Sequence, residues 1–189
     1  MRYVIVCLIK GEAGEFNDIL RMDIYDKFKA KSSKLPAHFT IKAPFEYDGD
    51  ISTLENDLEV LCGNEKEQLF TMKNYGHFDN RVVYMDVNMS REGQKLHDKI
   101  IDIMEKYPYI KFNKNDGRDK KFHVTLTSKK VPPIFNEVWE YVNKYPFEFK
   151  CSFDNIAIYK WNKDTWEFYK EFQMRKNNRV ENIRKNSMV

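Results

Sequence analysis

The sequence predicts one α+β domain built from two similarly organised halves. With 189 residues, of which 42% are hydrophobic and 15% aromatic, the chain is long enough for a single packed core. Strand-like and helix-like patterns follow the order strand, helix, strand, helix, strand, and this order occurs twice. The middle strand of each half carries His-x-Thr, at His38–Thr40 and again at His123–Thr125. The repeated order indicates a repeated arrangement, because the two halves share little other sequence.

The first half begins with "RYVIVCLI", a short run rich in β-branched residues that predicts a buried strand. Helices are predicted where apolar residues recur at helical spacing, and strands where apolar residues form short runs or alternate with polar ones. In the first half these elements are a strand at 2–9, a helix at 14–30, the motif strand at 36–45, a helix at 51–62 and a strand at 67–78.

The second half repeats this order and ends with an additional strand. "NKDT" predicts the turn into that last strand. The elements are a strand at 81–89, a helix at 91–108, the motif strand at 122–130, a helix at 134–145, a strand at 147–161 and the last strand at 166–174.

Composition bounds the class of protein and its location. Three widely spaced cysteines without a C-x-x-C pair favour neither a zinc ribbon nor a disulfide framework, so we expect a reducing, cytoplasmic setting. The apolar run in "MRYVIVCLIKGE" is too short for a signal peptide or a membrane span, so no membrane association is expected. We place the domain at 1–174 and a basic tail at 175–189, for which a surface helix is favoured. The tail holds five Lys/Arg and one acid, or +4, so the net charge of +3 leaves −1 for the domain.

The two motifs point to acid–base chemistry on a phosphate. Strand periodicity predicts that His38, Thr40 and Lys42 share one face, although a half-buried strand with an incidental histidine would show the same pattern. Two imidazoles facing one phosphate can act as base and acid, since both protonation states of histidine are accessible near neutral pH. Thr40 and Thr125 can donate hydrogen bonds to the phosphate oxygens. No metal is predicted, because no second ligand accompanies any histidine at a metal-binding spacing.

These residues resemble the 2H phosphoesterase superfamily, within it the bacterial 2′-5′ RNA ligase and RNA cyclic phosphodiesterase group. "HFTIKAPF" and "FHVTLTS" carry the two motifs, while "YGHFDNRVVYMDV" and "IAIYKWNKDTWEFYKEF" resemble the family's hairpins. The resemblance implies two lobes with pseudo-twofold symmetry, antiparallel sheets lining a central cleft and helices on the outside. One departure is Phe122, which stands where many relatives have proline.

The resemblance also implies a reaction and its partners. The expected substrate is RNA or a nucleotide with a 2′,3′-cyclic phosphate or a 2′-5′ phosphodiester, cleaved without metal or other cofactor. The reverse reaction would be ATP-independent 2′-5′ ligation. His38 is assigned as acid and His123 as base for opening a cyclic phosphate. We expect a monomer without DNA specificity. The alternatives are a non-catalytic module that binds nucleotides or RNA ends, and an interaction protein whose repeated motif is a packing coincidence.

Three further residues are candidates for substrate binding, each with a structural alternative. Lys42 can reach a phosphate from the motif strand, or it is a solvated strand lysine. Arg118 belongs to a basic cluster around the second motif that can attract an RNA backbone, or it lies in a solvated loop. Tyr159 can stack a base, or it belongs to the core. The "KNDG" stretch at 114–117 matches a ligase element, but Asn-Asp-Gly is also ordinary turn chemistry.

Overall fold

The protein is described here by a computed structural model for residues 1–113 and 116–177. Both halves form the predicted succession of strands and helices. The first half comprises β1 (Arg2–Leu8), α1 (Gly11–Phe28), β2 (His38–Glu46), α2 (Ser52–Asn64) and β3 (Gln68–Phe78). The second half comprises β4 (Val82–Met89), α3 (Arg91–Met104), β5 (His123–Thr127), the 3-10 turn η1 (Pro132–Ile134), α4 (Phe135–Val142), β6 (Glu148–Phe153), β7 (Asn155–Asn162) and β8 (Thr165–Gln173).

The strands form two antiparallel sheets that exchange strands between the halves. One sheet has the order β2-β1-β7-β8 and the other β5-β4-β3-β6. Strand β3 from the first half therefore lies in the second sheet, while β7 from the second half lies in the first sheet. Each motif strand occupies an edge of its sheet, next to the first strand of its own half. The predicted two-lobed α+β fold with pseudo-twofold symmetry is confirmed, with lobes that interleave.

The prediction of one strand at 147–161 is wrong. It divides at Asp154 into β6, which pairs with β3, and β7, which pairs with β1. The side chain of Asn155 fixes the position of this division. Its Nδ2 donates to the Leu8 carbonyl at 3.0 Å, and its Oδ1 accepts from the Leu8 N–H at 2.9 Å. The carbonyl of Asp154 accepts from the N–H of Met174 at 2.8 Å. One continuous run of apolar and polar residues thus supplies strands to both sheets.

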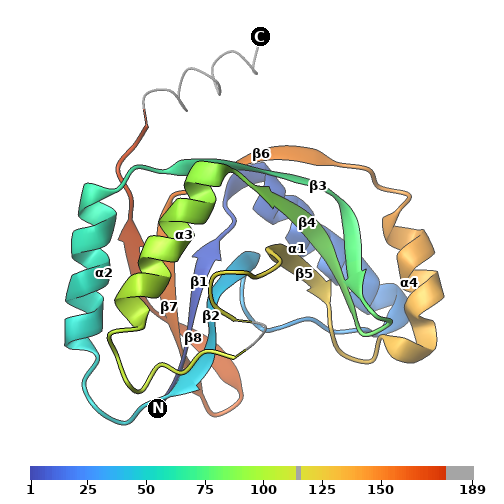
Figure 1. The fold of residues 1–189 in the computed structure, drawn as a ribbon. Coiled ribbons are helices and arrows are strands. Elements are labelled where there is room, and N and C mark those ends of the chain that lie inside the picture. Colours follow the sequence, from blue (N-terminus) through green and yellow to red (C-terminus); the bar gives the residue numbers. More distant parts are fainter. Residues whose placement is uncertain (114–115, 178–189) are drawn as a thin grey trace.

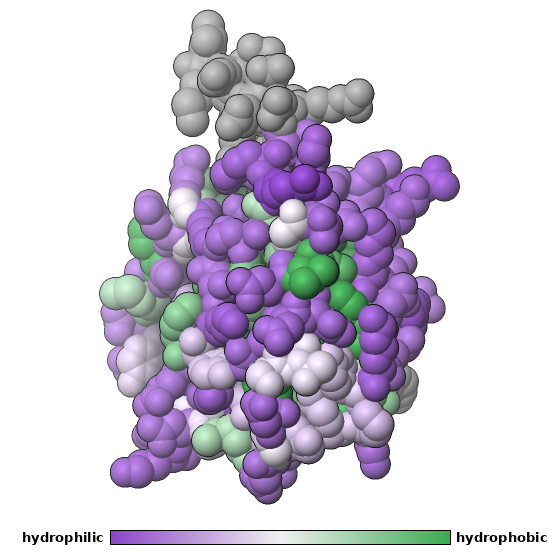
Figure 2. Space-filling view, turned by 90° about the vertical axis from the view of Figure 1, so that its left-hand side faces the viewer, coloured by the Kyte–Doolittle hydropathy of each residue, from purple (hydrophilic) through white to green (hydrophobic). Residues whose placement is uncertain are grey.

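The helices cover the two sheets from different sides (Figure 1). Helices α2 and α3 lie side by side, and α2 packs on β7 and β8. Helix α1 packs on β5 and against α4, which places a first-half helix on the second sheet. The face of the molecule on the α2 side is mainly hydrophilic, with scattered apolar residues such as those expected singly on any soluble surface (Figure 2).

One core connects both lobes, and Phe39 on β2 lies at its centre. The Phe39 side chain is fully buried. Its ring makes edge-to-face contacts with Phe70, Phe122 and Phe153, at centroid distances of 5.7, 5.4 and 5.0 Å. Phe70 and Phe153 belong to the second sheet, and Phe122 immediately precedes β5. Edge-to-face aromatic pairs stabilise a core beyond their area burial, so these contacts join the two sheets.

The first residues beyond the predicted domain boundary pair with the body. Arg175 exchanges backbone hydrogen bonds with Glu65 and Glu67, and its guanidinium donates to the Asn64 carbonyl. The N–H of Asn177 donates to Glu67 at 3.3 Å. Residues 178–189, which hold most of the predicted basic tail and its predicted surface helix, lie outside the described residues. Among the described residues, no helix is both long enough and apolar enough to cross a membrane.

Replacing Phe39 by alanine is expected to lower the free energy of unfolding by about 3–5 kcal/mol, the usual cost of removing a buried phenylalanine. Because the ring contacts both sheets, both lobes should lose stability in one cooperative transition. Urea unfolding followed by circular dichroism and by tryptophan fluorescence measures this. Phe168→Ala is the control, since Phe168 is 58% exposed. Two separate transitions would contradict a shared core.

Candidate active site

The two His-x-Thr motifs present their polar side chains on the sheet faces away from the core. In the first sheet, His38 lies opposite Leu8 and Thr40 opposite Val6, while the intervening Phe39 is fully buried. In the second sheet, His123 lies opposite Asp86 and Thr125 opposite Tyr84. All four motif side chains are partly exposed. The alternation predicted for the two motifs is therefore present in the structure.

Both histidines are held by the same local hydrogen bond. His38 Nδ1 lies 2.6 Å from the carbonyl oxygen of Pro36, and His123 Nδ1 lies 2.9 Å from that of Lys121. Each contact therefore joins an imidazole to the residue two positions earlier. Because a carbonyl oxygen can only accept, Nδ1 carries the proton in both rings, and Nε2 keeps its lone pair when the ring is neutral. The two motifs thus offer two equivalent Nε2 atoms for proton transfer.

Burial makes both imidazoles harder to protonate than a free histidine. Burial, helped by the positive charges of Arg21, His123 and Lys120, lowers the pKa of His38 to about 4, while the hydrogen bond to the Pro36 carbonyl acts in the opposite direction. Burial also lowers the pKa of His123, and Lys120 and Lys121 act in the same direction. The effect of His123 on the pKa of His38 shows that this ring senses the charge of the other motif. A bound anion would raise both pKa values.

Two aromatic side chains enclose His123, a role that sequence reasoning missed. The ring of Phe78 meets the imidazole edge-to-face at 4.9 Å, and the ring of Tyr84 lies 5.1 Å from it. Tyr84 takes this place because Gly76 on the neighbouring strand has no side chain: a Cβ there would lie 2.4 Å from the Tyr84 ring. The glycine inside a predicted strand was the one available signal, since such glycines mark the close approach of another group.

Lys42 does not share the face of His38 and Thr40, so that prediction is wrong. Thr40 pairs with Val6 and Lys42 pairs with Ile5, so β2 has one more residue than β1 between these positions. This β-bulge turns the next side chain to the opposite face. The Lys42 side chain is only 2% exposed, and its ammonium group forms an ion pair with Asp116. The geometry of the bulge removes Lys42 from the surface that carries the histidines.

Arg118 and Tyr159 are also engaged in internal contacts. The Arg118 guanidinium donates to both carboxylate oxygens of Glu105, at 2.5 and 2.9 Å, and to Asp102 on α3. The bonds to Glu105 raise the pKa of Arg118, so this permanently charged group is neutralised by carboxylates at the end of α3. Tyr159 lies on the same sheet face as Thr40, but it is 6% exposed and packs with Val4. Its ring therefore has no open face for a base.

The described residues contain no group of three or more His, Cys, Asp or Glu side chains able to hold a metal ion. In the "KNDG" stretch, Lys114 and Asn115 lie outside the described residues. Asp116 accepts from the buried Lys42, which gives the aspartate a role within the fold.

A sequence profile and solved structures relate the chain to known proteins. A sequence profile of the 2′-5′ RNA ligase superfamily matches residues 13–165. The fold is similar to that of TT0787 from Thermus thermophilus, with 14% identity, a TM-score of 0.67, and coverage of 94% of this chain and 100% of that one. It is also similar to LigT from E. coli in complex with 3′-AMP, with 14% identity, a TM-score of 0.58, and coverage of 92% and 97%. No curated protein matches the chain.

A third histidine, His97 on α3, is fully buried behind the site. Its ring meets Phe122 edge-to-face at 4.9 Å. Among the described residues, neither ring nitrogen makes a hydrogen bond of normal geometry, although the Ile41 backbone acts on the ring and Asp98 Oδ1 is 3.7 Å from Nδ1. Burial lowers the pKa of His97 to about 3, and the charge of Lys120 contributes. In the folded protein, His97 is therefore a buried and uncharged ring.

His97 is expected to make the fold sensitive to acid. The unfolded chain binds a proton at this residue below about pH 6.5, whereas the folded chain does so only near pH 3. Stability should therefore fall as the pH drops from 6.5 towards 3, by about 1.4 kcal/mol per pH unit from this residue alone. His97→Leu removes this loss, which urea unfolding of both proteins at pH 7 and pH 4.5 measures. An equal loss in both proteins would contradict the assignment.

Proposed function

Since the chain belongs to the 2′-5′ RNA ligase superfamily, we propose that it is a metal-independent phosphodiesterase of the 2H type. The proposed substrates are 2′,3′-cyclic phosphates or 2′-5′ phosphodiester ends of RNA or nucleotides. One observation carries the proposal: the histidines of the two motif strands have the same Nδ1–carbonyl hydrogen bond, which leaves both Nε2 atoms for proton transfer. The complex of LigT with 3′-AMP supports a nucleotide ligand for this fold.

Hydrolysis of a cyclic phosphate needs one base and one acid. The base Nε2 takes a proton from water as the water oxygen bonds to phosphorus. The bond from phosphorus to one ribose oxygen breaks, and the acid gives its Nε2 proton to that oxygen. In ligation a 5′-hydroxyl replaces water and the product is a 2′-5′ phosphodiester, so no ATP is consumed. The proton gained by one ring equals the proton lost by the other.

The family resemblance assigns His38 as acid and His123 as base in the hydrolytic direction. With a pKa of about 4, His38 can act as the acid only if its pKa rises when the phosphate binds. The negative charge of the phosphate provides that change, because an anion close to an imidazole favours its protonated form. Thr40 and Thr125 share the sheet faces of the two histidines, which supports a role for their hydroxyls in binding the non-bridging oxygens.

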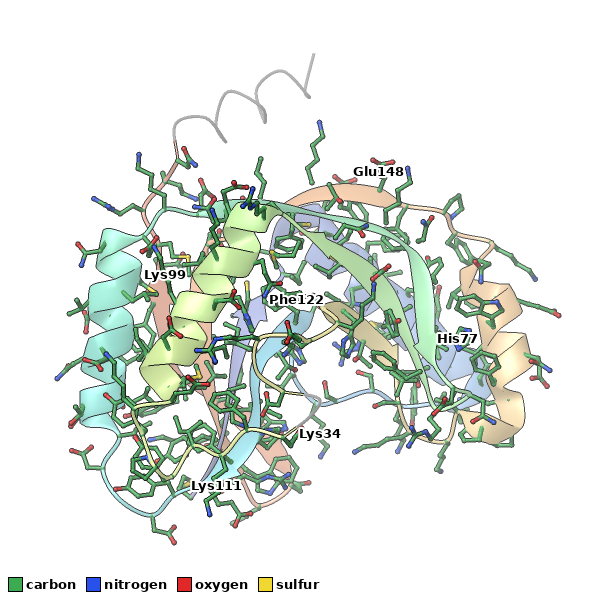
Figure 3. The ribbon with its side chains drawn as sticks, in the orientation of Figure 1. Lys34, His77, Lys99, Lys111, Phe122 and Glu148 are labelled. Carbon is green, nitrogen blue, oxygen red and sulfur yellow. The ribbon has the colours of Figure 1, made fainter. Side chains whose placement is uncertain are left out.

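Activity is tested with a panel of 2′,3′-cyclic nucleotides and 2′-5′ dinucleotides in excess EDTA. We expect turnover by the wild type and a loss of about 100-fold or more in kcat for His38→Ala and for His123→Ala, the usual contribution of general acid–base catalysis. Both side chains are partly exposed, so the melting temperature should change little. His77→Ala is the matched control, since His77 is exposed and packs on Phe135 and Trp139 beside α4 (Figure 3).

Two outcomes would contradict the proposal. Substantial activity in either histidine variant would exclude the two-histidine mechanism. Binding of these nucleotides without turnover by the wild type would favour the alternative, a non-catalytic module that recognises nucleotides or RNA ends.

A further inference from the structure

The segment before β5 crosses to the edge of β2 and bonds to its backbone. The Lys120 ammonium group donates to the carbonyl oxygen of Thr40, and Asp116 Oδ1 accepts from the N–H of Ala43 at 3.3 Å. Because β2 is an edge strand, its backbone has no neighbouring strand on that side among the described residues. Lys120 therefore bonds to the main chain of one catalytic motif and lies three residues before the histidine of the other.

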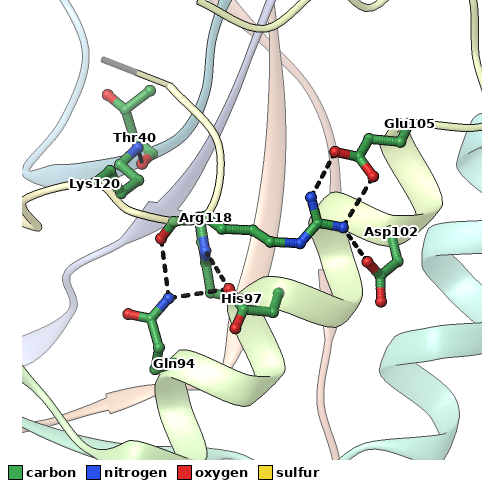
Figure 4. Close-up of polar contacts among 8 residues, drawn as sticks. Thr40, Gln94, His97, Asp102, Glu105, Arg118 and Lys120 are labelled. Carbon is green, nitrogen blue, oxygen red and sulfur yellow. Dashed lines mark hydrogen bonds and ion pairs between the residues drawn. The ribbon is translucent and has the colours of Figure 1, made fainter. Parts of the chain in front are cut away.

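The same segment is anchored on its other side to helix α3 (Figure 4). The Arg118 guanidinium binds Asp102 and Glu105, and the Arg118 carbonyl accepts from Gln94 Nε2 at 3.1 Å. Arg118, two residues before Lys120, is therefore bound to α3 through both its side chain and its carbonyl, which fixes the backbone from which the Lys120 side chain extends. The Lys120 ammonium group is held in one position by its bond to the Thr40 carbonyl, unlike that of a mobile surface lysine.

The charge of Lys120 is only partly compensated. Asp116 is the carboxylate that acts on it, but Asp116 already forms an ion pair with the buried Lys42. Two lysines therefore share one carboxylate. Burial lowers the pKa of Lys120 to about 8, and repulsion by Lys42 acts in the same direction. Burying a lysine that shares its carboxylate with a second lysine lowers the stability of the fold. Such an unfavourable charge is typical of a residue in a functional site.

We propose that Lys120 is a positioning residue of the active site, which holds the two motif strands together and supplies fixed positive charge to both histidines. The proposal rests on the proposed function. Lys120 appears among the groups that lower the pKa of His38, of His123 and of the buried His97. Its bond to the Thr40 carbonyl fixes the strand on which His38 and Thr40 lie. An incoming phosphate would meet this positive charge and would offset it.

Other charged groups around the site must stay unchanged for the effect to be assigned to Lys120. Lys121 is paired with Asp86 at 2.6 Å on the second sheet, and Arg118 is paired on α3. Arg21 on α1 acts on His38, and its guanidinium donates to the carbonyls of Ser33 and Leu35. None of these contacts involves the Lys120 side chain, so substitutions at Lys120 leave them in place.

Three substitutions separate the bond from the charge. Lys120→Gln keeps a donor for the Thr40 carbonyl but removes the charge, Lys120→Met removes both, and Lys120→Arg keeps both. The first measurement is an NMR titration of the imidazole signals, which is tractable because the chain has four histidines. We expect the pKa values of His38 and His123 to move upward in the Gln and Met variants and to stay low in the Arg variant. The His77 signal, beside α4, is the internal control.

The second measurement is the pH dependence of kcat/KM on a 2′,3′-cyclic nucleotide. In the Gln and Met variants the acidic limb should move to higher pH, and kcat should fall at least about tenfold in the Met variant, because the motif strands lose a fixed spacing. The Arg variant should retain the wild-type limb. A purely structural lysine would lower the melting temperature of the Met variant without moving either the limb or the histidine signals, and that result would overturn the proposal.

The two proposals can fail separately. If the wild type turns over no cyclic or 2′-5′ substrate, the proposed function fails, while the NMR titration still tests the action of Lys120 on the histidines. If the wild type is active and the histidine pKa values are the same in all four proteins, the inference about Lys120 fails and the proposed function stands.

Discussion

The contact on which the rest of the structure depends is that between β2 and the segment that begins β5. These two strands are edges of different sheets, so no backbone ladder joins them among the described residues. The rings of Phe39 and Phe122 meet instead, 5.4 Å apart at 85°. Phe39 follows His38 and Phe122 precedes His123, so this aromatic contact joins the two motif strands directly beside their histidines. In Figure 3, Phe122 lies between the lobes.

This contact also gives Phe122, the residue before the second motif histidine, a role in the fold. A proline would fix the backbone before the second motif through its own ring. Here the phenylalanine fixes it through packing, with Phe39 on one side and His97 on the other. The cost is that His97 is buried without a hydrogen bond of normal geometry among the described residues. Phe122 therefore packs between the motif residue Phe39 and the buried, titratable His97.

Local patterns in the sequence predicted the elements and the motif faces, because those properties depend on neighbouring residues. The alternation around Phe39 and Val124 placed both histidines and both threonines on the outer faces. The same reasoning failed for Lys42, since an extra residue in β2 shifts the register and no pattern in β2 alone reveals it. It failed again at Asp154, where the partners that divide the strand are Leu8 and Met174, both outside the divided run. Pairing between separate segments decides such positions.

The surroundings of the site were predictable only in part, for the same reason. The basic residues before the second motif were recognised, but the sequence could not separate their roles. Arg118 is neutralised by carboxylates at the end of α3, whereas Lys120 reaches a carbonyl 80 positions away. Likewise, Tyr159 was chosen as an aromatic residue on a late strand, while the rings that enclose His123 come from the hairpin of β3 and β4. Side chains with the same chemistry differ here only in which segments the fold brings beside them.

The electrostatics of the candidate site follow from this arrangement. Two imidazoles and a lysine that shares its carboxylate partner lie on or beside the motif strands. The pKa of each of these groups is lower than in water, so the positively charged form of each is less stable here. A phosphate supplies the negative charge that the site lacks, and so makes protonation of one imidazole favourable. Under the proposed function, the binding of the substrate would therefore form the acid that the reaction needs. A neutral molecule of the same shape would leave both histidines as bases, so the charge of the ligand, as well as its shape, decides whether the pair can act.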